Sequence, residues 1–387
     1  MLSPMPGAGV VCVSGATWLR VTKNISEEEV MKLFRTALMT AACVGILSAP
    51  ALAAYKQEYK LSVVPAATSG WGLSATYFAE LVKERTGGRI NIKVYPGAQL
   101  MAGKQTSELL LVRRGAIDFA LASTINWSPQ VQELNLTALP FFVANNPDRY
   151  KAMDAIEDGK SGKMLVDAVE KTGVKFIGWG ENGFRELTTS KGPINKPSDI
   201  KGMKLRVCGT PIFADIFTAL GANPQAINWS EAVTGFQQGI VDGQENPTNG
   251  INITLQIWNW HKYHTDWHYM IDPLLLTANS KVWKSFSKED QAIIMECAAE
   301  MEKYSKALSR LGFDDGSSLE YLKSINRVPA VTDPYKTMEE KGMNIVKFTD
   351  QQVDEFYAAT QSVRDKWTKE IGEDLVKAAE ADMKAAQ

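Results

Sequence analysis

Cysteine and histidine are scarce in this chain, which has four and three of them among 387 residues. Cys12 and Cys43 lie near the amino terminus, so only Cys208 and Cys297 remain to pair with each other. Cys208 ends a predicted strand, whereas Cys297 belongs to the buried face of a predicted helix. We therefore expect two separate buried thiols and no disulfide bond between them.

An excess of charge of either sign is also missing. The chain has 42 Lys and Arg residues against 44 Asp and Glu residues, a formal net charge of −2. We therefore expect neither nucleic acid nor a membrane surface as a partner. Beyond residue 53, no apolar run approaches the roughly 20 residues that a membrane-spanning helix needs, so we expect a soluble mature protein.

The amino-terminal segment has the pattern of a secretory leader. Met31 opens a basic stretch that continues to Arg35, an apolar run covers residues 37–47, and Ala51-Leu52-Ala53 follows. This order is typical of a signal peptide, and the apolar run is too short for a membrane anchor. We therefore predict an over-called upstream segment at 1–30, a signal peptide at 31–53 and a periplasmic mature protein that begins at Ala54.

Strand and helix patterns alternate through the first half of the mature chain. Strands are predicted at 61–64, 90–95 and 119–122, with helices at 71–85 and 104–114 between them. This β-α-β-α-β order predicts parallel strands joined by right-handed crossovers. The same patterns predict further helices at 163–171, 212–220 and 231–238, and further strands at 174–179, 186–189, 204–207, 225–228 and 269–277.

The mature chain is long enough to divide into two α/β domains. Because apolar strand character returns after residue 268, we predict that the first domain is discontinuous. Its segments are 54–182 and 268–311, and the second domain comprises 183–267 and 312–387. Ser287 caps a long helix that we expect to reach about Asn326 and to connect both domains. Thr349 and Gln352 form a capping box that opens a carboxy-terminal helix.

Three short polar stretches indicate a receptor for a small organic anion. They place Arg185 after Gly183 and Phe184, Arg206 in an apolar strand, and Asn246 after Glu245. A guanidinium group is a planar fork that matches a carboxylate or a sulfonate. An arginine that points inward from an apolar strand needs a partner, since an unpaired buried charge is costly. We expect Glu245 to orient an arginine and not to touch the ligand.

Each of these residues also has a structural alternative. Arg206 could form a structural ion pair, Arg185 could lie on a surface turn, and Asn246 could cap its own backbone. Trp127 and Trp229 follow predicted strands at the ends where α/β proteins bind ligands, although most tryptophans belong to the core. We take both as candidates for the wall of the site, where bulky indoles would favour a small ligand.

The glycine pattern at 178–183 has the spacing G-x-G-x-x-G, but we predict no nucleotide cofactor. A dinucleotide site needs a helix that begins at the glycines, and here the chain continues as a strand. We interpret the glycines as a crossover between domains, so that Arg185 leaves a tight turn.

The histidines raise the possibility of a metal site. His261, His264 and His268 lie close together with Asp266, but residues 260–264 have the pattern of a helix end that enters a loop. Because no Cys or Glu falls at ligand spacing, we predict no metal. A hydrolase is not indicated either, since no nucleophile motif accompanies the histidines.

The longest combined pattern in the chain resembles the solute-binding proteins of tripartite ATP-independent periplasmic (TRAP) transporters, of the dicarboxylate-binding type. The resemblance is closest between Gly178 and Pro247, and weaker matches extend from about Lys60 to about Lys341. Its segments are Phe184-Arg185, Pro-Ser-Asp-Ile-Lys-Gly-Met-Lys-Leu-Arg-Val at 197–207, Leu-Gly-Ala-Asn-Pro at 220–224 and Gly-Ile-Val-Asp-Gly-Gln-Glu-Asn-Pro at 239–247.

This resemblance implies a monomeric, non-catalytic periplasmic binding protein with two α/β domains, a hinged cleft and a long connecting helix. Its ligand would be a small organic anion, a carboxylate or a sulfonate, and its partners the small and large membrane subunits of the transporter. In the family, the position of Arg206 holds the carboxylate, Arg185 is a second arginine and Asn246 supplies an amide. The alternatives are a binding protein that serves a sensor and a metal-binding protein that uses the three histidines.

Overall fold

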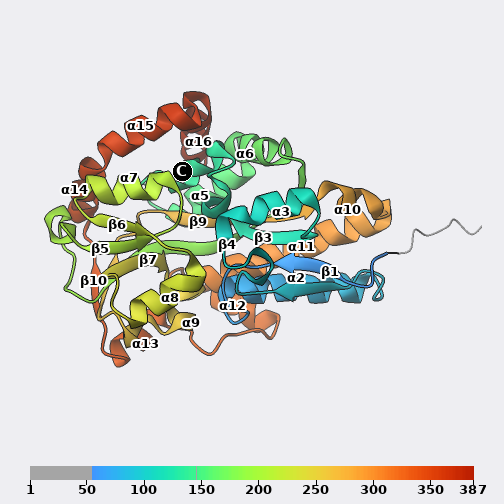
Figure 1. Ribbon diagram of the computed structural model, residues 1–387, viewed down its shortest axis with the longest axis horizontal. Helices are drawn as coiled ribbons and strands as arrows, with labels where there is room; N and C mark the ends of the chain where they lie inside the picture. Colours follow the sequence, from blue (N-terminus) through green and yellow to red (C-terminus); the bar gives the residue numbers. More distant parts are fainter. Residues whose placement is uncertain (1–54, 145) are drawn as a thin grey trace, which may run out of the picture. The chain divides into compact units, whose positions relative to one another are not determined.

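The structure is a computed structural model that describes residues 55–144 and 146–387 (Figure 1). The predicted upstream segment at 1–30, the signal peptide at 31–53 and the mature start at Ala54 lie outside the described residues and stay predictions. Within the described part of the chain, no helix combines the length and the apolar character needed to cross a membrane.

Five strands form the first part of the sheet. Their order is β2 (Ile92–Tyr95), β1 (Tyr59–Ser62), β3 (Phe119–Ser123), β9 (Ile271–Asn279) and β4 (Val174–Thr189). β1 is parallel to both β2 and β3, as the sequence predicts, and helices α2 (Gly70–Arg85) and α3 (Glu108–Arg114) make the connections. β9 runs antiparallel between β3 and β4 although it lies far along the chain, which confirms the predicted return.

The second part of the sheet shares strand β4 with the first. There β4 pairs antiparallel with β7 (Gly243–Pro247) and β8 (Tyr263–Asp266). β5 (Lys204–Val207) lies parallel to β7 and to β6 (Asn223–Ala226), and β10 (Asn344–Lys347) lies parallel to β8. The predicted helices of this region are present as α7 (Pro211–Ala219) and α8 (Trp229–Gln237).

Strand β4 differs from the prediction of two strands separated by a tight turn. It is one strand of 16 residues whose pairing with β9 shifts between Phe176 and Gly178 and again between Glu181 and Gly183. Gly183 has a φ of +110°, a value that favours glycine. Extra residues at such bulges bend a strand without ending it. Arg185 therefore lies within a continuous strand and does not leave a turn.

The long helix is shorter than predicted. α11 (Lys288–Arg310) has 23 residues, and α12 (Ser317–Ser324) is a separate helix. Gly312 and Gly316 between them have φ values of +81° and +96°, and this left-handed backbone ends a helix. The predicted apolar face is correct, since it is buried and α11 packs against α2 and β4. Its buried members include Ile294, Cys297, Met301, Tyr304 and Leu308.

The remaining helices surround these strands. The helices α15 and α16 return at the end of the chain to pack against α7 and against α5 and α6 (Figure 1). The capping box of Thr349 and Gln352 opens α14, as predicted. The bounds are α4 (Thr124–Trp127), α5 (Arg149–Asp158), α6 (Lys160–Glu170), α9 (Ile253–Leu255), α10 (Ser280–Ser285), α13 (Pro334–Glu340), α14 (Asp350–Ala359), α15 (Gln361–Ile371) and α16 (Glu373–Ala385).

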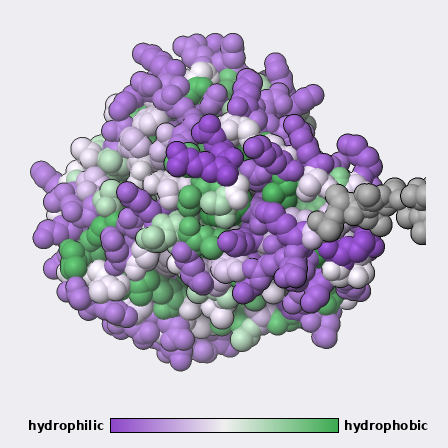
Figure 2. All heavy atoms as spheres, turned by 45° about the vertical axis from the view of Figure 1, so that its right-hand side comes forward, coloured by the Kyte–Doolittle hydropathy of each residue, from purple (hydrophilic) through white to green (hydrophobic). Residues whose placement is uncertain are grey.

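The polar surface and the state of the two cysteines agree with what the composition predicts. Figure 2 shows a face on which hydrophilic side chains predominate and apolar patches are small and scattered. Among the described residues, the large apolar side chains that are exposed are Ile240, Met295 and Val328. Cys208 and Cys297 are both buried and unpaired, which confirms the expectation of two separate thiols.

Candidate functional site

A small cavity of about 30 Å³ lies where β4, β5 and β7 meet the ends of β1, β3 and β9. Four of the five predicted site residues line it, namely Arg185, Arg206, Asn246 and Trp229, and Trp127 does not. The other lining residues are Val64, Pro65, Trp71, Gln105, Ser123, Asn126, Asn182, Cys208, Ile251 and Asp272.

Arg206 is a buried cation without a carboxylate partner among the described residues. It lies on β5 with 1% of its surface exposed, and its Nε donates a hydrogen bond of 3.0 Å to the carbonyl of Ile227. Nη1 lies 3.7 Å from Cys208 Sγ, whereas Nη2 has no hydrogen-bond partner in the described structure. The guanidinium carbon lies 5.5 Å from the centre of the Trp229 ring, which holds the cation in place.

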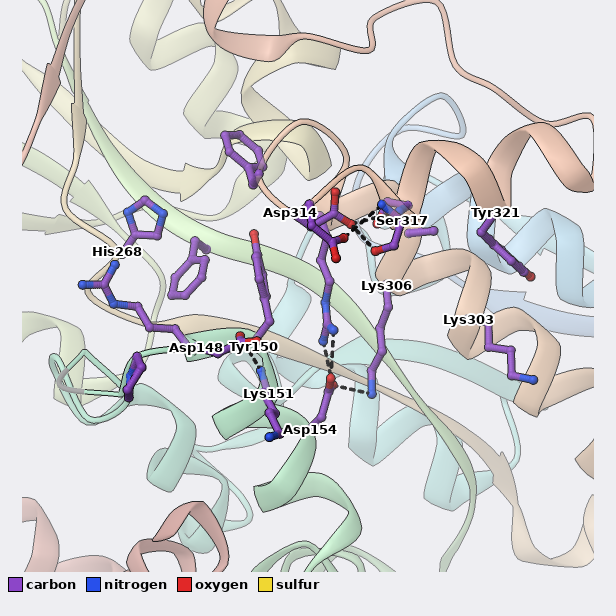
Figure 3. A pocket seen from close by; sticks show the side chains of 18 residues that line it. Asp148, Tyr150, Lys151, Asp154, His268, Lys303, Lys306, Asp314, Ser317 and Tyr321 are labelled. Atoms are coloured by element: carbon purple, nitrogen blue, oxygen red, sulfur yellow. Dashed lines mark hydrogen bonds and ion pairs between the residues drawn. The ribbon is translucent and has the colours of Figure 1, made fainter. Parts of the chain in front are cut away.

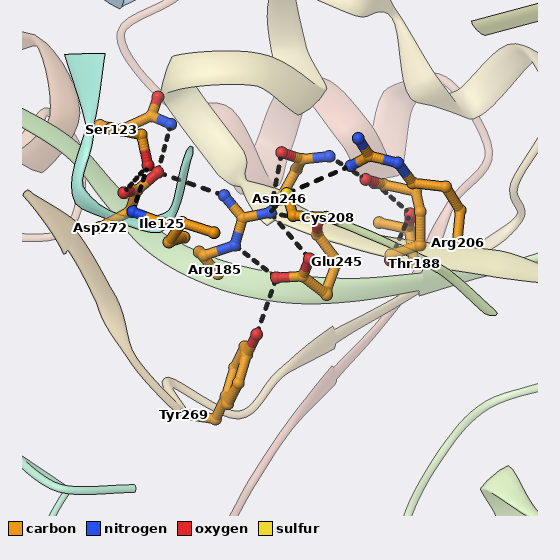
Figure 4. Close-up of polar contacts among 12 residues, drawn as sticks. Ser123, Ile125, Arg185, Thr188, Arg206, Cys208, Glu245, Asn246, Tyr269 and Asp272 are labelled. Carbon is orange, nitrogen blue, oxygen red and sulfur yellow. Dashed lines mark hydrogen bonds and ion pairs between the residues drawn. The ribbon is translucent and has the colours of Figure 1, made fainter. Parts of the chain in front are cut away.

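Arg185 lies on β4, which β7 separates from β5, and is fully occupied by protein partners (Figure 4). Its Nε and Nη2 form a two-pronged ion pair with the carboxylate of Glu245, with Nη2 2.8 Å from Oε1. Nη1 lies 3.2 Å from Oδ2 of Asp272, and Nη2 also donates to Oδ1 of Asn246 at 3.1 Å. The contact between Arg185 and Glu245 confirms that Glu245 orients an arginine.

Further hydrogen bonds fix the two carboxylates that hold Arg185. Glu245 accepts from the hydroxyl of Tyr269 at 2.8 Å, and Asp272 accepts from Ser123 at 2.6 Å and from Asn182 at 2.8 Å. Burial raises the pKa of Asp272, and Arg185 counteracts that rise. Although burial alone would lower it, Glu245 holds the pKa of Arg185 well above its ordinary value. This group therefore behaves as a fixed ion cluster.

Asn246 belongs to the same network. Its Oδ1 accepts from Arg185, and its Nδ2 donates to Oε1 of Gln244. Gln244 in turn donates to Thr188 and Asn252, both at 2.9 Å. The amide of Asn246 is therefore held between two protein groups beside the cavity.

The two candidate tryptophans have different surroundings. Trp229 begins α8 at the cavity, and its backbone N–H donates to Oε1 of Gln105 at 2.8 Å. Trp127 is fully buried, and its indole N–H donates to Oε2 of Glu108 at 3.1 Å. Trp127 is not among the residues that line the cavity, and its polar atom is committed to a buried carboxyl group.

Several lining residues carry no motif that the sequence could reveal. Gln105, Asn126 and Asn182 supply amide groups, and Asp272 supplies the second carboxylate that holds Arg185. Asn126 lies in the short helix α4 that begins directly after β3, so its place just beyond a strand was the available signal. Asp272 lies in an apolar strand 87 residues from Arg185, and only the pairing of β4 with β9 brings them together.

The three histidines do not converge on one point. Thr188 Oγ1 lies 2.9 Å from Nδ1 of His261, and Thr248 Oγ1 lies 3.1 Å from Nε2 of His264. Burial lowers the pKa of both histidines to about 4. A 3-10 helix does end at Asn259 and a loop follows, but the prediction that the loop includes His264 was wrong, since His264 lies on strand β8.

His268 instead lies beside two carboxyl groups. Its Nδ1 is 2.8 Å from Oδ1 of Asp266 and 3.6 Å from Oε1 of Glu186, so that three potential ligand atoms lie within 4.8 Å of one another. No Glu falls at ligand spacing in the sequence near these histidines, but strand β4 brings Glu186 beside His268 from far along the chain. Burial alone would lower the pKa of His268, but Glu186 and Asp266 raise it, as for an imidazolium between two carboxyl groups.

A larger and more open cavity of about 860 Å³ lies elsewhere, beside α5 and the end of α11 (Figure 3). Side chains of both signs line it. Arg310 lies 2.6 Å from Asp154 and 2.6 Å from Glu181, and Lys306 lies 2.9 Å from Asp154 and 2.7 Å from Glu157. Arg310 and Lys306 therefore already have carboxylate partners, whereas Arg149, Lys151 and Lys303 line this open cavity without an ion pair among the described residues.

Known proteins that are similar to this chain are solute-binding proteins, which agrees with a buried cation at a cavity. A family model described as bacterial extracellular solute-binding protein, family 7, matches residues 61–311, which is more than half of the chain. A solute-binding protein of Roseobacter denitrificans is 31% identical over 72% of this chain and 84% of its own length. The 2,3-diketo-L-gulonate-binding periplasmic protein of Escherichia coli is 28% identical over 89% of this chain and 97% of its own length.

Solved structures extend the similarity to the fold. A TRAP periplasmic solute-binding protein from Ralstonia eutropha, with bound (S)-2-acetolactate, is 44% identical with a TM-score of 0.78, over 86% of this chain and all (100%) of that one. One from Sulfurospirillum deleyianum, with bound succinate, is 27% identical with a TM-score of 0.71, over 84% of this chain and 98% of that one. The chain therefore belongs to family 7 of the bacterial extracellular solute-binding proteins, the DctP family, which serves TRAP transporters.

Proposed function

We propose that this protein captures a small organic anion in the periplasm and delivers it to the small and large membrane subunits of a TRAP transporter. The observation that carries the proposal is Arg206, whose guanidinium is buried at the cavity with Nη2 unpartnered in the described structure. A buried charge without a partner is costly, and an anion that enters the cavity removes that cost. A carboxylate also matches the fork of the guanidinium with two oxygens.

The other lining residues have supporting roles in this proposal. Arg185 and Asn246 form a rigid floor that fixes the anion beside Arg206, and Trp229 covers the guanidinium of Arg206. Trp127 supports the wall from outside the cavity, with its indole bonded to Glu108. Binding is the entire mechanism, and no reaction is catalysed.

The ligands of the structural neighbours support a carboxylate before a sulfonate. The Ralstonia protein, at 44% identity, was solved with acetolactate, and the Sulfurospirillum protein with succinate. Both ligands carry a carboxylate, the group that the fork of Arg206 matches. A sulfonate offers the same kind of oxygens and stays the second candidate.

Closure of two domains around the ligand fits the small size of the cavity. We place the domains at 54–182 plus 268–311 and at 183–267 plus 312–387, with the protein as a monomer. An anion could enter when the domains separate and would lose its water when they close. The attraction between Arg206 and the anion would then be stronger, because less water screens it.

A thermal-shift screen of organic acids and sulfonates tests this proposal. At least one acid should raise the melting temperature of the parent protein, because a ligand that binds only the folded state stabilises it. The same acid should shift the folded Arg206→Ala variant much less. Equal shifts in parent and variant would contradict the role of Arg206, and the absence of any shift would contradict the proposed ligand class.

A further inference from the structure

The charges around the small cavity suit one anionic group and not two. We propose that the site selects a short, singly charged carboxylate that also carries a hydroxyl or oxo group, and that it rejects dicarboxylates. This inference rests on the proposed function, because it concerns the ligand of the same cavity. The argument depends on how the protein uses its own charges.

Among the described residues, two cations line the cavity, and one of them is already neutralised. Arg185 pairs with Glu245 through two nitrogens and with Asp272 through a third. Two carboxylates thus surround one guanidinium, and all three side chains are at most 3% exposed. Arg206 is the cation that remains for a ligand, since the wall contains no lysine and no third arginine.

A second carboxylate on the ligand would meet the wrong partners. Asp272 lines the same wall, is fully buried and would repel another anion in a place from which water is excluded. The first backbone N–H of α8, which could otherwise favour an anion, is taken by Gln105. A dicarboxylate would therefore leave one of its two charges without compensation.

Neutral polar groups also line the wall. Gln105 and Asn126 are joined by a hydrogen bond of 2.7 Å, and Asn182 donates to Asp272 at 2.8 Å. The Oδ1 of Asn182 is buried and accepts no hydrogen bond within the described residues. A hydroxyl can donate to such an acceptor, whereas a carboxylate can only accept. Amides and a free acceptor therefore fit a hydroxy or oxo acid.

The size of the cavity limits the length of the ligand. Its volume is only about 30 Å³, and Trp71 and Trp229 contribute large rings to its wall. A long chain would require these rings to move apart. Short acids fit with the smallest rearrangement.

Asp272 is the residue that we expect to determine this selectivity. Asp272→Asn keeps the shape of the side chain and removes one negative charge, so that Arg185 is left with Glu245 as its anionic partner. Glu245→Gln is a second variant that makes the same change on the other side of Arg185. Asp290→Asn is the control, because Asp290 is another buried aspartate paired with an arginine, Arg89 at 2.6 Å, but does not line the cavity.

Calorimetric titration with four-carbon acids tests the inference. The probes are 2-hydroxybutyrate and 2-oxobutyrate, each with one charge, and succinate and malate, each with two. We expect at least one monocarboxylate to bind the parent 30-fold or more tightly than either dicarboxylate. Asp272→Asn, or Glu245→Gln if the first variant does not fold, should reduce that ratio at least tenfold, and Asp290→Asn should leave it unchanged.

The outcomes separate this inference from the proposed function. Dicarboxylates that bind the parent as tightly as the monocarboxylates, with binding lost in Arg206→Ala, would overturn the selectivity and leave the proposed function standing. The role of the ion cluster in selectivity would be overturned if Asp272→Asn and Glu245→Gln both fold and neither changes the ratio of monocarboxylate to dicarboxylate affinity. If none of the four acids binds, the selectivity proposed here is overturned. The wider thermal-shift screen then decides whether the proposed function survives.

Discussion

Arg185 and Arg206 show how neighbours decide what one kind of side chain does. Both were predicted from sequence as groups that hold an anion, and both line the same cavity. Arg185 pairs with Glu245 and Asp272, whereas Arg206 has no carboxylate partner among the described residues. The sequence could suggest Glu245 as an arginine partner, because it precedes Asn246 in the same motif. It could not suggest Asp272, which reaches Arg185 only through the pairing of β9 with β4.

Glu108 gives a prediction about pH. Its carboxyl group is fully buried and accepts from the hydroxyl of Ser62 at 2.6 Å and from the indole of Trp127. Burial raises the pKa of Glu108 to about 7, and the two hydrogen bonds reduce this rise. The pKa of Glu108 is higher in the folded state than in the unfolded chain. The stability that the protonated carboxyl group contributes is therefore fully present below the pKa that Glu108 has in the unfolded chain. It is lost as the pH rises through about 7.

We therefore expect Glu108→Gln to gain stability relative to the parent as the pH rises. Between pH 5 and pH 8, the difference in the free energy of unfolding should move in favour of the variant by about 2–3 kcal/mol. Urea denaturation of both proteins at the two pH values measures this change. A difference that stays constant with pH would show that Glu108 does not carry a raised pKa.

Strand β4 and helix α11 show where local patterns are ambiguous. The glycines between Gly178 and Gly183 have the signal of a turn and equally that of a bulged strand. Only the partner strands decide between the two, because β9 pairs with β4 across this segment and β7 pairs with β4 directly after it. For α11, the apolar stripe predicted the buried face correctly, but the stripe continues into α12 and hides the break at Gly312.

Two glycine substitutions should have opposite effects on stability. Gly183 in β4 has a φ of +110°, and a Cβ there would lie 3.4 Å from Ser309, so Gly183→Ala should destabilise the fold by about 1–3 kcal/mol. Gly235 lies inside α8 with no atom within 4 Å of an added Cβ. Gly235→Ala should therefore stabilise by about 0.5–1 kcal/mol. Denaturant midpoints of both variants check this contrast, and equal shifts in the same direction would contradict it.

The overall fold could be predicted from the sequence more completely than the surroundings of the site residues. Alternating elements predicted the α/β class, the parallel strands and the late return of the chain to the first sheet, and the family and its solved members agree. The domain bounds and the signal peptide stay predictions. What the sequence could not provide was the set of polar residues around the cavity, because Asn126, Asn182 and Asp272 come from helix α4 and from strands β4 and β9 and share no motif.

The central claim concerns one side chain, and calorimetric titration of four proteins with the tightest acid tests it. Arg206→Ala should lose roughly 2–5 kcal/mol of binding free energy, or about 30- to 4000-fold in affinity. Arg206→Lys should also bind more weakly, because a point charge does not replace a fork. Asn246→Ala should lose about 1–2 kcal/mol. An Arg206→Ala variant that is folded and binds within about threefold of the parent, a difference under roughly 0.7 kcal/mol, would contradict the account.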